Sequence, residues 1–231
     1  MEQPLIKITN LKKSFGKRLI FNNLNLNIQE GEALALMGPN GSGKTTLLDI
    51  ICGLCKVTAG KIEFKNQKDF FLNLGMQFQD GKYPTGIRVK DLIWLYANLY
   101  NEKIDKKLKE QFQIKKIEKS SVNSISFGER KRLELFLLLN SKNKILILDE
   151  ITSGMDISVR LWIIQCLKEY MKLHKVTLIY ISHDFREVEK LCNRVVMLGK
   201  KGIIFDEKIE SHFSLEKKIE SVLTAEAKNE K

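Results

Sequence analysis

The glycine-rich segment GPNGSGKT, residues 38–45, constrains the fold of this chain more than any other feature. A continuous apolar run at residues 33–37 precedes it, and residues 45–51 follow at helical spacing until Gly53. A buried strand, a glycine-rich turn and a helix in this order are the context in which GxxxxGK[ST] binds phosphate groups. Glycines let backbone N–H groups converge on phosphate oxygens, and the N-terminus of the helix adds partial positive charge. We therefore expect this loop to bind a nucleoside triphosphate, ATP with magnesium.

The residue types of the loop predict separate roles for its members. Lys44 is expected to reach the β and γ phosphates, and the Thr45 hydroxyl is expected to bind Mg²⁺. The alternative is a chance glycine-rich turn, which the flanking strand and helix disfavour. The predicted nucleotide-binding residues of the loop are Gly38, Pro39, Asn40, Gly41, Ser42, Gly43, Lys44, Thr45 and Thr46.

Two adjacent acids, Asp149 and Glu150, end a second apolar run at residues 145–148. Ligands of parallel α/β sheets bind at the carboxyl ends of the strands. We therefore expect Asp149 to hold the magnesium, directly or through water, and Glu150 to polarise a water for attack on the γ phosphate. Ordinary solvation of a loop is the alternative reading of two such acids, and the phosphate loop upstream makes it the weaker one.

The remaining patterns predict an α/β fold with one inserted region. Residues 5–8 and 24–28 alternate as half-buried antiparallel strands do, and residues 89–139 are lysine-rich with apolar residues at helical spacing. Strand, helix and strand in succession favour a parallel sheet. Further strands are predicted at 60–64, 144–148, 176–181, 194–198 and 202–205, the last two as a hairpin, and a helix at 159–173.

We thus predict a P-loop NTPase fold with a mixed, mainly parallel core sheet. An N-terminal antiparallel β subdomain precedes it, and a helical subdomain at about 88–140 is inserted into it. Residues 1–231 are expected to form one domain, with 206–231 as a peripheral C-terminal helix or tail.

Composition limits the location and the partners. With 43% hydrophobic residues, the sequence contains no run of the roughly 20 apolar residues that a membrane span needs, and its start does not look like a secretory signal. A cytoplasmic location follows. Of the four cysteines, only Cys52 and Cys55 are closely spaced, and core packing explains Cys52 better than metal or redox chemistry. The net charge of +11 is scattered along the chain, so we expect no nucleic-acid partner, whereas proximity to an anionic membrane surface would suit it.

A segment between the phosphate loop and the acidic pair narrows the class further. Residues 125–132, ISFGERKR, lie about twenty residues before Asp149 and resemble the LSGGQ signature of ABC-transporter ATPase subunits. Four more landmarks of that family follow its order and spacing along nearly the whole chain. They are Phe15 at the adenine-stacking position, Gln79 at the Q-loop position, Asp156 at the end of the D-loop in residues 153–156, and His183 at the switch position.

The resemblance implies a role for each landmark. Gln79 would sense the γ phosphate and magnesium, and Ser126 and Gly128 of one copy would contact the ATP held by Lys44 of a second copy. Taken singly, Phe15 could be a core aromatic and His183 could serve its own backbone neighbourhood. The chain departs from the family pattern at Phe15, which replaces tyrosine, at Phe127, which replaces a glycine, and at Ile151, which replaces proline. None of these departures removes a chemical group that hydrolysis needs.

The resemblance therefore implies an ATP-hydrolysing subunit that dimerises on ATP and powers transport by an ABC transporter. Its partners would be an integral-membrane permease, docked at residues 79–91, and a second copy or a similar ATPase subunit, on the inner face of the cell membrane. A likeness to ABC-2-type exporters favours export. A soluble ABC-type ATPase, a kinase and a non-hydrolysing nucleotide module are the competing functions. The transported substrate, the direction of transport and the choice between homodimer and heterodimer stay open.

Overall fold

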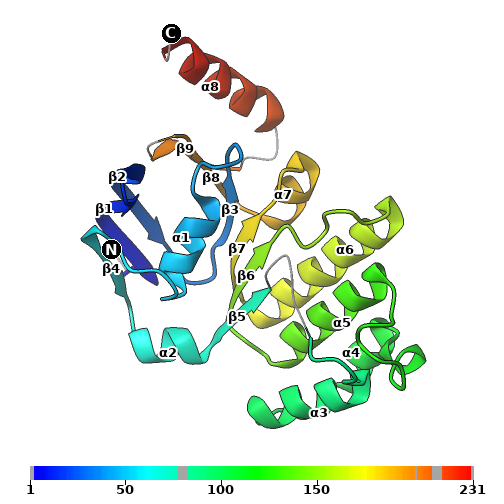
Figure 1. Ribbon diagram of the computed structural model, residues 1–231. Coiled ribbons are helices and arrows are strands. Elements are labelled where there is room, and N and C mark those ends of the chain that lie inside the picture. Colours follow the sequence, from blue (N-terminus) through cyan, green and yellow to red (C-terminus); the bar gives the residue numbers. More distant parts are fainter. Residues whose placement is uncertain (1–2, 78–82, 201, 210–214, 230–231) are drawn as a thin grey trace. The chain divides into compact units, whose positions relative to one another are not determined.

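The computed structural model describes residues 3–77, 83–200, 202–209 and 215–229 (Figure 1). The chain divides into two compact units. The first combines residues 1–72 with 175–231, and the second comprises residues 73–174. The elements of each unit follow from the local sequence.

The first unit contains a three-stranded antiparallel sheet in the order β2-β1-β4. Its strands are β1 (Ile6–Phe15), β2 (Arg18–Ile28) and β4 (Ala59–Phe64). Ile6 and Ile8 of β1 are buried between exposed or half-buried neighbours, so the predicted antiparallel subdomain is confirmed. Both β1 and β2 are longer than predicted. Register shifts after Ile8 interrupt the two-residue alternation, so the sequence pattern no longer indicates a strand beyond that residue.

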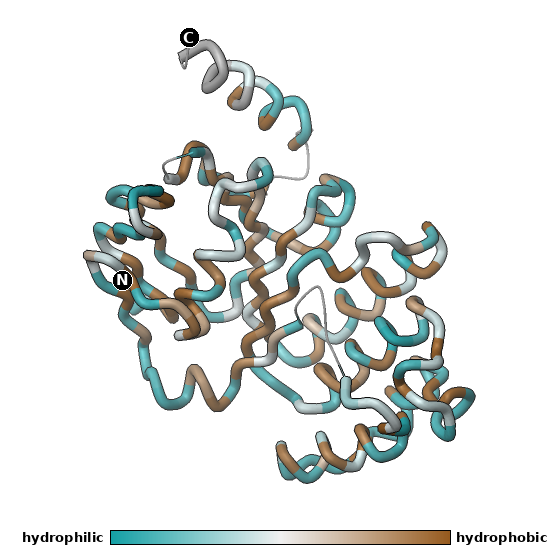
Figure 2. Tube along the Cα trace, viewed as in Figure 1, coloured by the Kyte–Doolittle hydropathy of each residue, from teal (hydrophilic) through white to brown (hydrophobic). Residues whose placement is uncertain are grey.

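The same unit also contains the parallel strands that carry the phosphate loop. β3 (Ala33–Met37) pairs in parallel with β7 (Thr177–Ile181) and with β8 (Arg194–Leu198), and β9 (Ile203–Lys208) pairs antiparallel to β8. Every residue of β3 and β7 is buried, which explains their continuous apolar runs (Figure 2). The predicted mixed, mainly parallel sheet with a closing hairpin is confirmed. The hairpin extends past the expected start of the tail, because Asp206 pairs with Val196.

Four helices belong to this unit within the described ranges. They are α1 (Lys44–Ile51), α2 (Gln67–Leu72), α7 (Phe185–Leu191) and α8 (Leu215–Asn229). The predicted helix after the phosphate loop is confirmed as α1. α2 and α7 were not predicted, because six or seven residues are too few to show a helical period.

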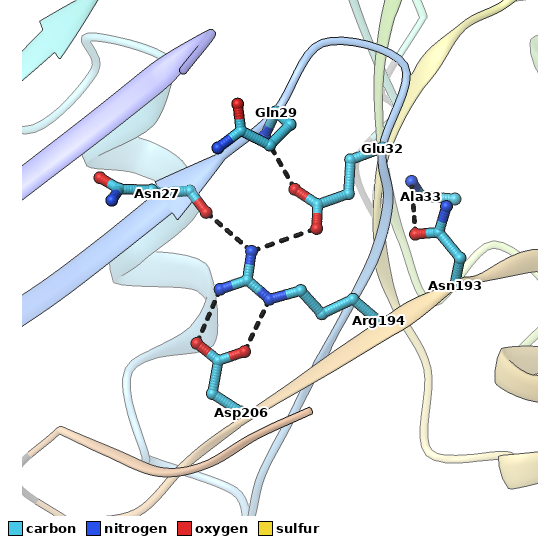
Figure 3. A network of polar contacts seen from close by, with 7 residues as sticks. All are labelled: Asn27, Gln29, Glu32, Ala33, Asn193, Arg194 and Asp206. Carbon is cyan, nitrogen blue, oxygen red and sulfur yellow. Dashed lines mark hydrogen bonds and ion pairs between the residues drawn. The ribbon is translucent and has the colours of Figure 1, made fainter. Parts of the chain in front are cut away.

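An arginine clamp fastens β8 to its neighbours in this unit (Figure 3). The guanidinium of Arg194 donates from Nε and Nη2 to the two carboxylate oxygens of Asp206, at 2.6 and 2.7 Å. Its Nη1 donates to the Asn27 carbonyl at 2.8 Å and to Glu32 at 3.1 Å. Glu32 in turn accepts from the backbone N–H of Gln29 at 2.8 Å. The end of β2, the turn before β3, and strands β8 and β9 are thereby joined through one side chain.

The second unit pairs two parallel strands and is otherwise helical. β5 (Leu74–Gln77) lies parallel to β6 (Ile145–Asp149). Its helices are α3 (Val89–Leu99), α4 (Lys106–Gln111), η1 (Ile114–Lys116), α5 (Phe127–Asn140) and α6 (Ile157–His174). Phe112 packs against Phe136 and Trp162, with ring centroids 6.3 and 4.9 Å apart, and these contacts join α5 and α6. The predicted helical character of residues 89–139 is confirmed. In the described ranges no helix is both long and apolar enough to cross a bilayer.

Candidate functional site

The phosphate loop connects β3 to α1 and depends on its glycines. Gly38 and Gly43 have φ values of +143° and +100°. A Cβ at Gly38 would lie 2.4 Å from the Leu198 carbonyl oxygen, and one at Gly43 would lie 2.6 Å from Cζ of Phe21. Larger residues would therefore displace the loop at both positions.

The polar groups of the loop suit a phosphate ligand. Lys44 is buried, and its Nζ donates to the carbonyl oxygens of Gly38 at 2.8 Å and Pro39 at 3.2 Å. The hydroxyl of Ser42 is buried and finds no hydrogen-bond partner within the described chain. α1 starts after Gly43 without a side-chain cap from any described residue, so N–H groups of its first turn are available to an anion. Pro39, Asn40 and Thr45 are exposed, and Thr46 is half-buried.

Phe15 ends β1 as an exposed aromatic, with 52% of its surface accessible. The ammonium group of Lys13 lies 4.3 Å from the centroid of its ring. Lys13 is buried, and its Nζ donates to the Lys56 carbonyl at 2.7 Å. A fixed cation thus covers part of the ring and helps to hold its position.

His183 lies at the same sheet edge as the phosphate loop. Ile181 of β7 is in register with Leu36 of β3, and these strands lead into His183 and Gly38 respectively. His183 is exposed, whereas the segment around it is anchored. Buried Glu187 accepts from Ser182 Oγ at 2.9 Å and from the Tyr180 hydroxyl at 2.6 Å. Asp184 caps α7 by accepting from the Arg186 N–H at 2.9 Å.

In the second unit, Asp149 is the last residue of β6 and Glu150 follows it. Both are half-buried. Glu150 has a φ of +47°, a conformation that non-glycine residues rarely adopt and that occurs often at functional sites. Gln77 is in register with Leu148, so the chain leaves β5 at the edge where Asp149 lies. Gln79 falls outside the described residues.

Ser126 caps the N-terminus of α5, and Gly128 lies in its first turn. Glu129 accepts from the Ser126 backbone N–H at 2.9 Å, and the Ser126 hydroxyl accepts from the Glu129 N–H at 3.3 Å, so the two residues form a capping box. The hydroxyl also donates to the Glu129 carboxylate at 2.9 Å. The bonds from the Ser126 backbone and side chain lower the pKa of Glu129. A Cβ at Gly128 would meet no described atom within 4 Å, so its surroundings are open. Asp156 is exposed shortly before α6.

A buried polar cluster in this unit was not predicted. Glu134 of α5 accepts from Gln77 Nε2 at 2.9 Å and pairs with Lys131 at 3.0 Å. Burial, followed by the charge of Glu134, raises the pKa of Tyr83. Gln77 and Tyr83, the described residues on either side of 78–82, thus both interact with Glu134 of α5. Helical periodicity places Glu134 on a mostly apolar face of α5, and an acidic residue at such a position is the one sequence signal for the cluster.

The structure thus groups the predicted site residues by unit. Phe15, the phosphate loop and His183 belong to the first, whereas Ser126, Gly128, Asp149, Glu150 and Asp156 belong to the second. A glycine-rich phosphate loop between a buried parallel strand and a helix defines a P-loop nucleotide-binding fold.

Comparison with known proteins gives the family. The family described as ABC transporter matches residues 21–153. The lantibiotic transport ATP-binding protein SrtF of Streptococcus pyogenes is 31% identical over 217 residues, covering 92% of this chain and 94% of that protein. The energy-coupling factor transporter ATP-binding protein EcfA1 of Ligilactobacillus salivarius is 33% identical, covering 90% of this chain and 79% of that protein. The chain therefore belongs to the ABC transporter family, as ATP-binding and ATP-hydrolysing subunit.

Solved structures agree on the fold. An ATP-binding subunit of an ABC transporter has a TM-score of 0.81 at 18% identity, and the match covers 95% of this chain and 99% of that one. A dimeric ATP-binding cassette in a post-hydrolysis state, bound to ADP and Pi, has a TM-score of 0.75 at 23% identity, covering 89% of this chain and 99% of that one. The predicted fold class, family and ATPase activity are confirmed. The roles of single residues stay predictions.

Proposed function

We propose that this chain hydrolyses magnesium-bound ATP between two paired copies and passes the resulting motion to a separate integral-membrane subunit. The observation that carries the proposal is the phosphate loop. A buried lysine whose Nζ donates to two loop carbonyls, a buried Ser42 hydroxyl with no hydrogen-bond partner among the described residues, and a helix start that no described side chain caps converge there. Each of these groups gains a partner when a phosphate enters.

Each proposed site residue has a separate role in binding or hydrolysing the nucleotide. Lys44 exchanges its carbonyl partners for phosphate oxygens, and Thr45 and Asp149, with Gln79, would hold a magnesium ion. Bound there, magnesium would supply positive charge beside the phosphates. Glu150 orients a water and accepts its proton, and His183 contacts the γ phosphate. Phe15 stacks on the adenine with the face that Lys13 leaves open.

Pairing of two copies would complete each site. Ser126 and Gly128 of one copy contact the nucleotide held by the other, and Asp156 lies at the contact between copies. The open surroundings of Gly128 and the exposure of Phe127, at 52%, and Ile157, at 73%, support a surface that another chain covers. Release of the γ phosphate removes the bridge between the two copies, and they separate.

A membrane partner follows from the family. The relatives named above are ATP-binding proteins of transport systems, and the one from Streptococcus pyogenes is named for lantibiotic transport. We infer a cytoplasmic subunit, peripheral on the inner face of the cell membrane, that docks a permease at residues 79–91 and serves export. Substitutions in 83–88 that abolish co-purification of a multi-span partner while ATPase activity persists would support this docking site. Retention of the partner would count against it.

The proposed chemistry is tested by turnover of three variants. Lys44→Ala removes the phosphate contact and should abolish ATP binding. Glu150→Gln should bind ATP normally and turn it over at least about 100-fold more slowly, as loss of a general base does. Glu63→Gln, an exposed acid on β4, serves as the control and should match the wild type. Unchanged turnover in Glu150→Gln would refute the assigned base.

A further inference from the structure

Arg18 lies between two parts of the nucleotide site. It is the first residue of β2 and the register partner of Phe15, the residue proposed to stack on the adenine. Its Nη2 lies 3.7 Å from the position that a Cβ on Gly41 would occupy. One cationic side chain therefore starts beside the aromatic ring and ends beside the phosphate loop.

The strand that carries Arg18 is packed directly against the same loop. Cγ2 of Ile20 lies 2.8 Å, and Cζ of Phe21 2.6 Å, from the position of a Cβ on Gly43. Phe21 is fully buried, so this contact is part of the core. Because Arg18 is only two residues from Ile20, the packing fixes its Cα relative to the loop.

The charge of Arg18 is not paired with any described residue of the chain. The side chain is exposed, and no described residue accepts a hydrogen bond from it or forms an ion pair with it. Arg194 differs, since two carboxylates and a carbonyl accept from it. The guanidinium of Arg18 keeps all five donors available, in the planar arrangement that suits phosphate oxygens. Lys44, by contrast, is turned onto the carbonyls of its own loop.

We propose that Arg18 binds the phosphate tail of the nucleotide as a second cation beside Lys44. This inference rests on the proposed nucleotide site. Arg18 fixes the nucleotide from the side of β2, between the ring that holds its base and the loop that holds its phosphates. The opposing possibility is that Arg18 only holds the β1–β2 hairpin that carries Phe15, in which case its loss would weaken ADP and adenosine alike.

Equilibrium binding of ADP and adenosine to the full chain tests the assignment, because neither ligand is hydrolysed. Arg18→Gln should weaken ADP binding by about tenfold, the effect of one charge-assisted hydrogen bond, and leave adenosine within about twofold. The ADP affinity of Arg18→Lys should lie between those of Arg18→Gln and the wild type, since lysine keeps the charge and loses the planar arrangement of donors. Lys17→Gln, the exposed neighbouring cation, is the control and should change neither ligand. The deficit of Arg18→Gln should shrink as salt rises.

Two outcomes would overturn the proposal. One is ADP affinity of Arg18→Gln within about twofold of the wild type, and the other is an equal loss for ADP and adenosine. Thermal unfolding of Arg18→Gln, expected to match the wild type, separates lost contacts from lost folding. ADP binding by the wild type and its loss in Lys44→Ala test the nucleotide site itself, so failure of that site and failure of the Arg18 assignment are distinguishable.

Discussion

Replacing Gly43 by alanine should separate backbone strain from packing at the phosphate loop. Gly43 and Gly41 both have positive φ, +100° and +81°, so alanine costs about 1–2 kcal/mol of strain at either position. Only at Gly43 does the new Cβ collide with the core, at 2.6 Å from Phe21. At Gly41 the nearest atom is the far end of Arg18, 3.7 Å away. Overpacking a buried aromatic costs a further 1–3 kcal/mol, roughly.

Urea unfolding followed by circular dichroism measures this difference. We expect Gly43→Ala to lose about 2–5 kcal/mol in free energy of unfolding and Gly41→Ala about 1–2 kcal/mol. Phe21→Leu should partly rescue Gly43→Ala, with a coupling free energy of about 1 kcal/mol in a double-mutant cycle. Equal losses for the two alanine variants, within about 0.5 kcal/mol, would refute the tight packing of β2 on the loop.

Three further predictions follow from other parts of the molecule. Arg194→Met should lower the free energy of unfolding by about 2–3 kcal/mol because Glu32 loses its cation. Lys61→Met, which breaks an exposed ion pair, is the control and should cost under about 0.5 kcal/mol. Circular dichroism is the probe, since Trp94 and Trp162 both lie in the other unit. Ser126→Ala should cost about 1 kcal/mol at neutral pH. Because the folded pKa of Glu129 is lowered, its contribution to the cap is present above its unfolded pKa and is lost as pH falls through the folded pKa. The free energies of unfolding of Ser126→Ala and the wild type should therefore converge in acid, which acid unfolding of the two proteins measures. Alkylation followed by mass spectrometry should modify half-buried Cys55 before Cys52, since burial raises the pKa of the Cys52 thiol to about 12; equal rates would contradict this.

Long or chemically distinctive segments could be predicted from the sequence. The apolar run of β3 coincides with the predicted strand because all its residues are buried, and β8 likewise matches its predicted range. The phosphate loop is recognisable because only glycine fits at Gly38 and Gly43. In these places local sequence and tertiary packing require the same residue types.

Short elements and long-range contacts could not be predicted. β5 has four residues and α2 has six, with a single residue between them, so neither shows a period. The pairing of Arg194 with Glu32 spans 162 positions, and nothing in the sequence around either residue indicates it. Arg18 is similar: it reads as one more surface cation until the hairpin places it opposite Phe15 and beside Gly41.

Whether two copies close over ATP can be read from the mass of Glu150→Gln in solution. Light scattering after gel filtration, with saturating ATP and magnesium, should show a dimer, and removal of the nucleotide should return a monomer. Lys44→Ala under the same conditions should stay monomeric. If Glu150→Gln binds ATP and still remains a monomer, with no companion ATPase subunit restoring the pair, two copies do not close over ATP.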